Sequence, residues 1–507
     1  MSDDKHKVVG FIDIGTNSIH VLVVRFFGNS MGTPIFQDKE SVRLGQNLFR
    51  RGSIDKETID KTRVVIGRFV NIAKDMGAEE IIAYATCAAR EASNRKELLD
   101  AIRVDGLDVK VISGLEEARL IRLGLFGPVA PERRVLGIDI GGGSTEIMLC
   151  KGVDDLYLDS LSMGAIRFAY GGIVNQSDSM SFQDYDFLRR QVDLMSHRAC
   201  RRIREIGFDT AYGSSGTMMA LAEMCAAERG DGDSSYMMYY ELVKLMKVLY
   251  TKDIEERKTV NGMSPARADI IVAGGAIAEE LMHLLNIDRI EISNNGLKQG
   301  MEIDYLLSNG HSNFNVKDSS VVSLANRCNY DKVHAETVQR NALNLFDLMK
   351  AEGIHSMDDE MRMLLSYAAL LHDVGEFISY NKHHMHSYTI ILNSYLPGFV
   401  IEELRIMALI ARFHHKKFPD RDSKHFRDMD DAEVSAILNC AMILKIADIL
   451  DRHRTSSIED IKIKVDESSM ELRLISDSDL SMEMWKLKTI KEDFEKVFGL
   501  SFKVVKI

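Results

Sequence analysis

Two segments in the first 150 residues each consist of two apolar runs joined by a short polar turn. Residues 9–24 read VGFIDIGTNSIHVLVV: an apolar segment ends at Asp13, a glycine-containing turn follows, and a second apolar segment begins near Ser18. Residues 136–150 read LGIDIGGGSTEIMLC and repeat this order around Asp139. Each segment predicts a β-hairpin, because two apolar strands joined by a short glycine-containing turn are typical of hairpins.

The two segments form an internal repeat. When Asp13 is aligned with Asp139, four further pairs are identical: Ile12 with Ile138, Ile14 with Ile140, Gly15 with Gly141, and Ser18 with Ser144. A duplicated hairpin predicts two related α/β domains whose glycine turns face each other across a cleft.

The second turn, Asp-Ile-Gly-Gly-Gly-Ser-Thr at residues 139–145, has a composition suited to phosphate. Glycines lack a Cβ atom, so successive backbone N–H groups can surround one anion, and the hydroxyls of Ser144 and Thr145 add donors. Asp139, at the end of the strand, is placed to hold Mg²⁺ against that phosphate, because Mg²⁺ is usually bound by one or two carboxylates together with phosphate oxygens. The alternative is a tight turn with an incidental acidic residue, and the second copy argues against it.

Two further glycine-rich segments follow the repeat. Residues 212–217, Tyr-Gly-Ser-Ser-Gly-Thr, predict a third turn before a helix, with Gly213 and Ser214 as further phosphate contacts. The apolar run 270–272 predicts a strand, followed by a turn at 273–276, Ala-Gly-Gly-Ala. In this order, the turns are expected to line one cleft.

The last third of the chain changes to helical periodicity. Apolar residues recur at intervals of three and four in four segments, which predict helices at 333–350, 358–372, 401–416 and 431–451. The final residues predict a β-β-α-β unit, with strands at 461–465 and 470–475, a helix at 480–497 and a strand at 500–507. This unit carries no chemical motif of its own.

Composition narrows the class of protein. The 507 residues include 64 Lys and Arg against 76 Asp and Glu, a formal net charge of −12, which argues against binding to nucleic acid or to a membrane surface. Hydrophobic residues make up 45%, which excludes a disordered chain, and no stretch approaches the ~20 apolar residues that span a bilayer. The six cysteines stand far apart without a CxxC pair, so they predict reduced thiols and a cytoplasmic location.

Residues 109–123, VKVISGLEEARLIRL, predict a short strand, a break at Ser113 and a helix that opens with Glu116 and Glu117. Acidic residues in the first turn favour the positive end of the helix dipole, so capping alone can explain the pair. A glutamate that projects from a helix start toward a phosphate cleft is also where a general base for water would lie.

Several motifs in order resemble the exopolyphosphatase and guanosine pentaphosphate phosphohydrolase family, over residues 8 to about 303. They are DIGTNS at 13–18, the Ala-Ala-Arg-Glu-Ala run around Arg90, SGLEEARL at 113–120, DIGGGSTE at 139–146, MGAIR at 163–167, Arg-Ala-Asp at 267–269 and GLKQG at 296–300. The duplicated motif resembles the wider superfamily of acetate and sugar kinases, actin and the heat-shock ATPases, in which two related domains close on a phosphate chain.

This resemblance implies roles for individual residues. Glu117 would be the base that activates water, with Glu116 as the alternative if the helix register differs. Asp139 and Glu146 would lie near Mg²⁺, or Mn²⁺ in its place, and near the attacked phosphate. The phosphate-binding groups would be those of two turns and one arginine fork: Thr16, Asn17 and Ser18; Gly141, Gly142, Gly143, Ser144 and Thr145; and Arg90.

Ten of the fifteen histidines fall within residues 334–453. Their order resembles an HD-type phosphohydrolase domain, whose signature is a histidine, a His-Asp pair, further histidines and a late aspartate. The signature would be filled by His334, His372, Asp373, one of His383, His384 and His386, then His414 and Asp448. Imidazole and carboxylate ligands suit Mn²⁺, Fe²⁺ or Zn²⁺, so a second divalent metal is one interpretation and structural His-Asp hydrogen bonds are the other.

The same region and residues 201–204 contain the densest basic clusters of the chain. If they line a channel, they would hold a long polyphosphate; a solvated helix surface is the alternative. These residues are Arg201, Arg202, Arg204, Lys382, His383, His384, His386, Arg412, His414, Lys416, Lys417, Arg452 and Arg454.

The predicted fold class is α/β: two duplicated actin-like domains of the acetate and sugar kinase and heat-shock ATPase type, followed by an all-α HD-like domain and a small α+β module. We expect domain I at 1–130, domain II at 131–305, the helical domain at 306–458 and the module at 459–507. Oligomers are usually symmetric dimers and the resemblance also favours one, so a homodimer is expected.

The predicted function is that of an exopolyphosphatase, which releases orthophosphate from the end of inorganic polyphosphate with Mg²⁺. The alternative within the family is removal of the terminal 5′-phosphate of guanosine pentaphosphate, and the motifs do not separate the two substrates. Rivals of other classes are a kinase of the same fold, which would need a phosphoryl acceptor, and a non-enzymatic sensor of polyphosphate or of guanosine penta- or tetraphosphate.

Overall fold

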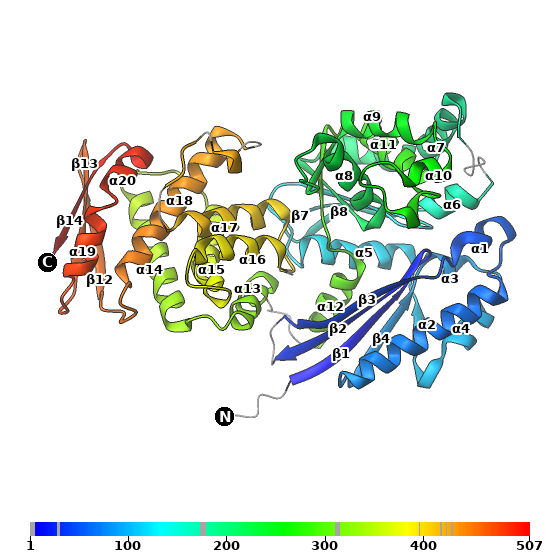
Figure 1. Cartoon of the computed structure of the whole chain (residues 1–507), viewed down its shortest axis with the longest axis horizontal. Coiled ribbons are helices and arrows are strands. Elements are labelled where there is room, and N and C mark those ends of the chain that lie inside the picture. The colour runs from blue at the N-terminus through cyan, green and yellow to red at the C-terminus, as the bar shows by residue number, and fades with distance from the viewer. Residues whose placement is uncertain are drawn as a thin grey trace. The chain divides into compact units, whose positions relative to one another are not determined.

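The computed structural model describes residues 6–27, 31–172, 179–309, 315–394, 396–415, 418–421, 423–426 and 429–507. The chain forms two compact units (Figure 1). Unit 1 comprises residues up to 316 together with 397–401, and unit 2 comprises 317–396 and 402–507. No helix within the described residues combines the length and the apolarity needed to cross a membrane.

The first hairpin belongs to a five-stranded sheet in the order β3-β2-β1-β4-β5. Its first three strands are antiparallel neighbours: β1 (His6–Ile14), β2 (Ser18–Phe27) and β3 (Thr33–Ser41). The other two are parallel to β1: β4 (Glu80–Ala85) and β5 (Val109–Val111). The connecting helices are α1 (Gly45–Arg51), α2 (Lys56–Asp75), α3 (Cys87–Glu91), α4 (Arg95–Ile102) and the short 3₁₀ turn η1 (Val104–Gly106).

The second hairpin belongs to a six-stranded sheet in the order β10-β11-β9-β6-β7-β8. The strands are β6 (Val135–Ile140), β7 (Thr145–Lys151), β8 (Asp154–Leu161), β9 (Thr210–Ser214), β10 (Tyr236–Met238) and β11 (Arg289–Ile292). Five strands of this sheet, in the order β8-β7-β6-β9-β11, correspond to the five strands β3-β2-β1-β4-β5 of the first sheet. In both sheets the two hairpin strands are antiparallel, and the first of them has a parallel strand on its other side. The shared topology confirms both predicted hairpins and the internal repeat.

The helices that accompany the six-stranded sheet differ from the sequence prediction in one segment. They are α6 (Ala165–Tyr170), α7 (Phe182–Ile206), α8 (Ser215–Arg229), α9 (Tyr239–Leu249), α10 (Ile254–Lys258), η2 (Pro265–Arg267) and α11 (Ile271–Leu285). The strand predicted at 270–272 and the turn at 273–276 are wrong, because both lie in or beside α11. Gly274 and Gly275 serve packing: a Cβ atom would lie 2.4 Å from Thr217 of α8 and 2.3 Å from Met246 of α9, respectively. A short apolar run next to glycines does not distinguish a buried strand from a buried helix.

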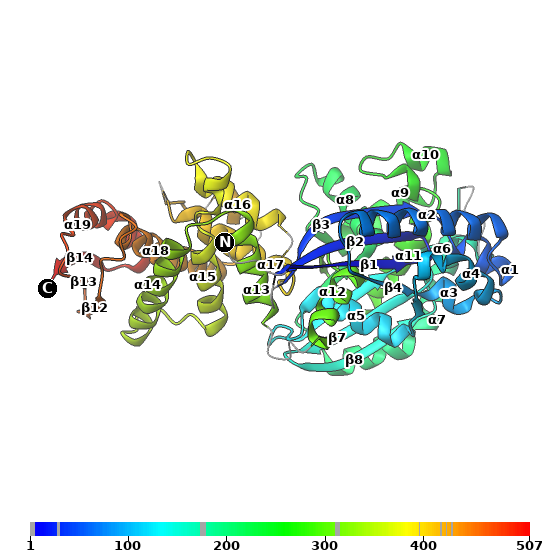
Figure 2. The same ribbon diagram turned by 90° about the horizontal axis from the view of Figure 1, so that it is seen from below.

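Two helices of unit 1 each pack against the sheet that they do not follow in the sequence. α5 (Gly114–Phe126) follows the first sheet in the sequence but packs against β7 and β8 of the second, and α12 (Leu297–Ser308) follows the second sheet but packs against β1. Figures 1 and 2 show α5 and α12 side by side. They cross in backbone contact, since a Cβ atom on Gly300 would lie 1.8 Å from the carbonyl oxygen of Leu120. The crossing brings the start of each helix to the space between the sheets.

Unit 2 contains the four predicted helices and the β-β-α-β module. Its helices are α13 (Val316–Arg327), α14 (Lys332–Ala351), α15 (Asp359–Leu371), η3 (Val374–Phe377), α16 (His383–Asn393), α17 (Ile401–Phe413), η4 (Lys424–Phe426) and α18 (Asp431–Leu450). The module consists of β12 (Asp460–Val465), β13 (Ser469–Ile475), α19 (Ser481–Lys488), α20 (Lys491–Phe498) and β14 (Ser501–Lys506). The single helix predicted at 480–497 is two helices, since α19 ends before Thr489 and α20 begins after Ile490.

Candidate active site

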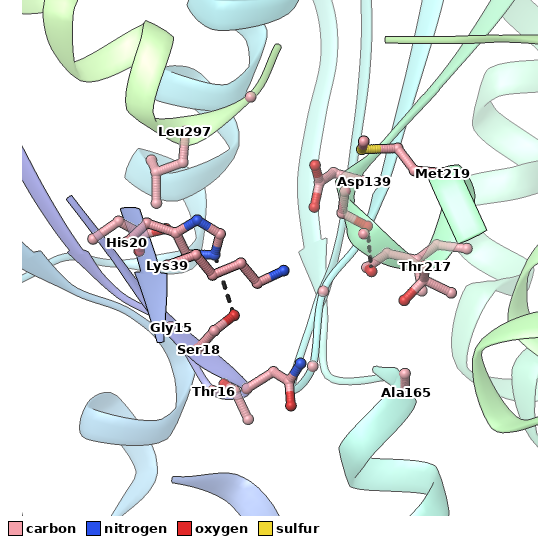
Figure 3. Close-up of a pocket in the computed structure, with 18 of the residues that line it drawn as sticks. Gly15, Thr16, Ser18, His20, Lys39, Asp139, Ala165, Thr217, Met219 and Leu297 are labelled. Atoms are coloured by element: carbon pink, nitrogen blue, oxygen red, sulfur yellow. Dashed lines mark hydrogen bonds between the residues drawn. The ribbon is translucent and has the colours of Figure 1, made fainter. Parts of the chain in front are cut away.

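A cleft of about 650 Å³ lies where the two hairpin turns of unit 1 meet. The first turn contributes residues 15–18 and the second contributes residues 141–144. Figure 3 shows His20 and Lys39 projecting from the first sheet, with Asp139 and Thr217 on the opposite side. The convergence that the repeat predicted is therefore present.

The two turns have the same local geometry. The N–H of Gly15 donates to the carbonyl of Ser18 at 3.1 Å, and the N–H of Gly141 donates to the carbonyl of Ser144 at 3.0 Å. The carbonyls of Thr16 and Gly142 are each bound by N–H groups at the start of the helix that follows, α1 and α6 respectively. Because these carbonyls are engaged by the protein, the turns present N–H and hydroxyl groups to a bound anion.

The turns approach so closely that two of the glycines are required. A Cβ atom on Gly142 would lie 3.1 Å from Cβ of Thr16, and one on Gly143 would lie 2.6 Å from Sγ of Cys87 and 2.8 Å from Oγ1 of Thr16. A larger residue at either position would require the side chain of Thr16 or the turns themselves to shift. The composition of the second turn therefore reflects contact with the first turn as well as room for phosphate.

Three carboxylates with raised pKa values line the cleft: half-buried Asp13, and buried Glu117 and Asp139. Burial raises the pKa of Asp13 to about 7, of Glu117 to about 7 and of Asp139 to about 6. The charge of Asp139 adds to the upward shift of the other two. Oδ1 of Asp13 and Oδ1 of Asn17 are buried and have no hydrogen-bond partner within the described part of the chain. Oxygen ligands with these raised pKa values fit a hard divalent cation such as Mg²⁺.

Glu117 occupies the first turn of α5, and Ser113 caps this helix by accepting from the N–H of Glu116 at 3.1 Å. Arg90 donates to Oε2 of Glu117 at 3.1 Å and to the carbonyl of Ile112 at 2.9 Å. Glu116 turns away and receives two hydrogen bonds from Arg119 at 2.8 Å. The register of α5 therefore directs Glu117, and not Glu116, to the cleft.

Cations line the same cleft, and the sequence analysis assigned them no role. Lys39, Arg267 and Lys298 all belong to its lining. Burial lowers the pKa of each, to about 8 for Lys39, whose pKa is lowered further by the charges of Arg267 and Lys298. Within the described residues none of the three makes an ion pair. An anion with several charges would neutralise them.

Signals for two of these cations were present in the sequence. Arg267 lies in the Arg-Ala-Asp motif and Lys298 in GLKQG, both of which carried the family resemblance. Asp13 was the aligned partner of Asp139 in the repeat. Lys39 belongs to no sequence motif. It lies near the end of the edge strand β3, and the pairing register of β3 with β2 brings it to the cleft.

Several predicted phosphate contacts lie elsewhere. Thr145 is fully buried and donates to the carbonyl of Met163 at 2.7 Å. Ser214 is fully buried and donates to Asp139, and Gly213 lies within β9. Residues 215–217 line the cleft in their place, because β9 passes directly into α8. Ser215 has a φ of +78° and donates to the carbonyl of Ile140 at 2.6 Å.

Two other predicted residues act behind the lining. Glu146 is buried and accepts a hydrogen bond from Ser160 at 2.8 Å. Burial raises the pKa of Glu146 well above its usual range, and the charge of Glu117 adds to this shift. Arg90 contacts Glu117 and is not part of the cleft lining, so it holds the candidate base and does not form the predicted phosphate fork.

Unit 2 brings together every predicted residue of the HD-like signature. Nε2 of His334 lies 3.6 Å from Oδ1 of Asp448 and 3.8 Å from Oδ2 of Asp373, and Nε2 of His372 lies 3.7 Å and 3.6 Å from the same two oxygens. Of the three alternatives left open, His383 joins this centre, since its Nε2 lies 3.3 Å from Oδ1 of Asp373. Nε2 of His414, the remaining residue of the signature, lies 3.7 Å from Oδ1 of Asp373.

The opposite ring nitrogen of each histidine is held by the protein. Nδ1 of His372 lies 2.7 Å from the carbonyl of Ala369, and Nδ1 of His414 lies 2.5 Å from that of Ala411. Nδ1 of His383 lies 3.1 Å from the carbonyl of Tyr380, and Nδ1 of His334 lies 2.8 Å from Oδ2 of Asp451. Such contacts fix the tautomer and leave Nε2 as the ligand atom, as in metal-binding histidines.

The residues predicted to line a polyphosphate channel are divided between the two units. Lys416 and Lys417 lie outside the described residues. Arg201 and Arg202 are exposed on α7 and lie near Glu205, which is typical of a solvated helix surface. Arg454 donates to Asp373 at 3.4 Å and to Glu376 at 2.9 Å, beside the histidine cluster.

Comparison with known proteins identifies two family matches. The model of the Ppx/GppA phosphatase family matches residues 23–309, and that of Ppx/GppA phosphatase domain III matches residues 316–492. A guanosine-5′-triphosphate,3′-diphosphate pyrophosphatase of Aeromonas hydrophila is 29% identical over 472 residues, which covers 92% of each chain. The protein of the same name in Vibrio vulnificus is 26% identical over 449 residues and 88% of each chain.

Solved structures resemble the first part of the chain. An exopolyphosphatase from Cytophaga hutchinsonii is 27% identical, with a TM-score of 0.55, and the match covers 60% of this chain and 98% of that one. A Ppx/GppA family member from Aquifex aeolicus shares the fold at 23% identity, with a TM-score of 0.50, over 61% of this chain and 100% of that one.

Mg²⁺ is expected to stabilise the chain more at high pH than at low pH. The folded pKa values of Asp13 and Asp139, about 7 and about 6, lie above the ordinary value of about 3.9, so these carboxyls favour folding while protonated. That contribution is lost as the pH rises from about 4 through about 7. Mg²⁺ binds the ionised form, so its stabilisation grows over the same range. The measurement is the change in Tm on adding Mg²⁺ at about pH 5.5 and at about pH 8.

The variant Asp13→Asn should lose most of the Mg²⁺-induced increase in Tm at the higher pH. Asp60→Asn, at an exposed position on α2, should retain it. An equal increase at both pH values, or an unchanged increase in Asp13→Asn, would contradict this account of the cleft.

Proposed function

The chain belongs to the Ppx/GppA phosphatase family, and from this membership we propose that its cleft is that of an exopolyphosphatase. It would hydrolyse the terminal phosphoanhydride bond of inorganic polyphosphate and release orthophosphate. The observation that carries the proposal is the placement of buried Glu117 in one cleft with two glycine turns and with three cations that make no ion pair within the described residues.

The cleft has the groups that a polyanion needs. The N–H and hydroxyl groups of Thr16, Asn17, Ser18 and residues 141–144 would bind the oxygens of the terminal phosphate from two sides. Lys39, Arg267 and Lys298 would bind the phosphates that follow along the chain. This arrangement suits a linear chain of phosphates, whose charge is spread along its length.

Glu117 would act as the general base. A buried carboxylate with a pKa near 7 can take a proton from water at neutral pH while the water oxygen attacks phosphorus. Arg90 would keep the carboxylate oriented, and the two turns would stabilise the charge on the equatorial oxygens of the terminal phosphate, which is the main source of catalysis in phosphoryl transfer. Asp139 and Asp13 would hold a Mg²⁺ ion that supplies further positive charge beside the attacked phosphate.

Hydrolysis of guanosine pentaphosphate is the second candidate. The relatives that match over about nine-tenths of both chains are named for that substrate, whereas the exopolyphosphatase from Cytophaga hutchinsonii matches 60% of this chain. The same attack on a terminal phosphoanhydride would serve both substrates.

The proposed location is the cytoplasm, where the six buried cysteines would stay reduced as they are in the structure. A homodimer remains a prediction.

Glu117→Gln is expected to lower turnover on polyphosphate by about 10² to 10⁴, the usual contribution of a general base. In the unaltered protein, turnover should rise with pH up to about 7, because the base must be ionised, and the variant should lose this acidic limb. The KM for polyphosphate should change little. The matched control is Glu116→Gln, whose side chain pairs with Arg119 outside the cleft lining. Equal losses in the two variants would remove Glu117 from this role.

Side-by-side kinetics separate the candidate substrates. The full chain with Mg²⁺ should release phosphate from long-chain polyphosphate and guanosine pentaphosphate without any acceptor alcohol, and much more slowly from ATP and bis-nitrophenyl phosphate. Lys298→Met should raise the KM for polyphosphate and weaken its salt dependence, because it removes a cation of the cleft. Lys96→Met, exposed on α4, is the control. Transfer to an acceptor without release of phosphate would indicate a kinase, and binding without turnover a sensor.

We also propose that unit 2 binds a divalent cation in its HD-like cluster. His334, His372, Asp373 and Asp448 face one point, and Nε2 of fully buried His372 has no hydrogen-bond partner in the described part of the chain. Imidazole with carboxylate favours Mn²⁺, Fe²⁺ or Zn²⁺ over Mg²⁺. The alternative of purely structural hydrogen bonds is less well supported, since a histidine nitrogen without a partner gains nothing from burial.

Metal analysis tests this cation. The purified full chain should retain a transition-metal ion after gel filtration, and Asp448→Asn should lose it. The control Asp460→Asn, at an exposed position in β12, should retain it. Identical metal content in all three proteins would refute the site.

A further inference from the structure

Two arginines cross between the halves of unit 1. The elements from β1 to β5 are here called the first lobe, and those from β6 to β11 the second lobe. Arg43 lies between β3 and α1 of the first lobe, and its side chain binds Asp269 of the second lobe. Arg167 lies in α6 of the second lobe, and its side chain binds Glu91 at the end of α3 in the first lobe. The two ion pairs therefore connect the lobes in opposite directions.

The contact between Arg43 and Asp269 is bidentate. Nη1 donates to Oδ2 of Asp269 at 2.6 Å, and Nη2 donates to Oδ1 at 3.1 Å. Nη2 also donates to the carbonyl of Ala266 at 2.8 Å, and the hydroxyl of Tyr170 donates to the same carboxylate. The side chain of Asp269 is only 14% exposed, so water screens this pair less than a surface pair. A bidentate pair also fixes the relative position of its partners more narrowly than a single contact does.

Arg167 contacts both lobes. Nη2 donates to Oε1 of Glu91 at 2.7 Å and to Sγ of Cys87 at 3.3 Å. The guanidinium carbon lies 4.2 Å from the centre of the ring of Phe49 in α1. These three residues belong to the first lobe, whereas Nε donates to the carbonyl of Gly143 in the second lobe at 2.6 Å. The guanidinium group thus ties the second glycine turn to the first lobe.

Each arginine also holds the phosphate-binding turn of its own lobe. The N–H of Arg43 donates to the carbonyl of Asn17 at 2.8 Å, and the N–H of Arg167 donates to the carbonyl of Gly142 at 3.0 Å. Asn17 and Gly143 are equivalent positions of the internal repeat, and the carbonyl of each is bound by the arginine of its lobe. A movement of one lobe is therefore transmitted to both turns.

The backbone of Arg43 supports a role for its side chain. Its φ of +59° lies in the left-handed region, which glycine adopts without strain and other residues rarely adopt. A glycine here would keep the N–H bond to Asn17 and would lose only the contacts of the side chain with Asp269 and Ala266. A side chain retained in a strained conformation indicates that its contacts have a use.

The two ion pairs adjoin a small apolar contact between the lobes. α1 packs against α6 (Figures 1 and 2). Phe49, next to Arg167, and Tyr170, next to Asp269, pack against a buried cluster that contains Ile166. Apolar contact is non-directional, so it does not by itself fix the separation of the turns. The hydrogen bonds of the arginines depend on distance and angle and can fix it.

We propose that Arg43 and Arg167 are positioning residues, which set the separation of the two turns around the terminal phosphate of the substrate. This inference rests on the exopolyphosphatase function proposed for the cleft. Neither arginine belongs to the cleft lining, so each acts through the turn that it holds. The turns must bind the phosphate from two sides and present it to the water that Glu117 activates. A displacement of about 1 Å in such an arrangement can lower the rate by about 10²-fold.

Arg43→Met should lower kcat on polyphosphate by about 10²-fold and change the KM little, because the cations that line the cleft still bind the phosphate chain. Arg43→Lys should lose less, since lysine supplies the charge without the bidentate geometry. Arg50→Met, at an exposed position on α1, is the matched control and should keep the kcat of the parent. An unchanged kcat in Arg43→Met would overturn the proposal. So would a raised KM at unchanged kcat, which would make Arg43 a substrate-binding residue.

A double-mutant cycle tests whether Arg43 acts through its partner. Asp269→Asn should lower kcat as Arg43→Met does, and the double variant should lose no more than either single variant, because all three lack the same contact. Each should keep the acidic limb of the pH profile that ends near pH 7, since Glu117 is unaltered. Additive losses, or a missing acidic limb, would show that Arg43 does not act by positioning and would overturn the proposal.

The separation of the lobes is measured directly with spin labels on the full chain. Lys96→Cys on α4 and Lys244→Cys on α9 place one label at an exposed position of each lobe, and the six native cysteines are buried. Pulsed electron paramagnetic resonance should give a longer and broader distance distribution when Arg43→Met and Arg167→Met are combined, both without ligand and with Mg²⁺ and tripolyphosphate. The same measurement on Arg43→Lys should give a smaller change and serves if the combined variant does not fold.

An identical distance distribution in the labelled parent and in these variants would overturn the inference, whatever the parent hydrolyses. Absence of polyphosphate turnover in the parent, together with a lengthened distance in the variants, would refute the proposed function alone. The two failures are therefore distinguished.

Discussion

The site of unit 1 depends on holding three carboxylates with raised pKa values in the lining of one cleft. Asp13 and Asp139 end equivalent strands of the two sheets, and Glu117 begins the helix that crosses between them. Burial raises the pKa of all three, so the arrangement costs free energy unless a cation compensates. The close contact of the turns at Gly142 and the crossing of α5 and α12 at Gly300 keep the groups in place.

The same cleft adds three cations to these acids. The charges of Arg267 and Lys298 lower the pKa of Lys39, and none of the three makes an ion pair within the described residues, as expected of a site for an anionic ligand. A phosphate chain with a bound divalent cation is complementary to this pattern, because it presents negative charge to the lysines and positive charge to the carboxylates. The charges of the cleft thus fit the phosphate ligand with a divalent cation that we propose, and Figure 3 shows Lys39 and Asp139 on opposite sides of the cleft.

Unit 2 applies a related principle with different atoms. Each of its four inward-facing histidines gives one ring nitrogen to the protein and directs the other to Asp373 or Asp448. Such pre-orientation would keep the ligand atoms in position for the ion that we propose, which would lower the entropy cost of its binding. The chain therefore combines an oxygen-rich centre and an imidazole-rich centre, each within its own compact unit.

The sequence by itself determined the hairpins, their duplication, the helices of unit 2 and many of the residues that line the cleft, because glycine turns, apolar periodicity and the spacing of acids and histidines are local signals. It did not determine that α11 begins at Ile271, that Ser214 binds Asp139, or that Lys39 reaches the cleft. Those facts follow from helix packing and strand register, which depend on contacts between residues far apart in the chain. Tertiary structure also decided between Glu116 and Glu117, since only the packing of α5 fixes which glutamate faces the phosphate turns.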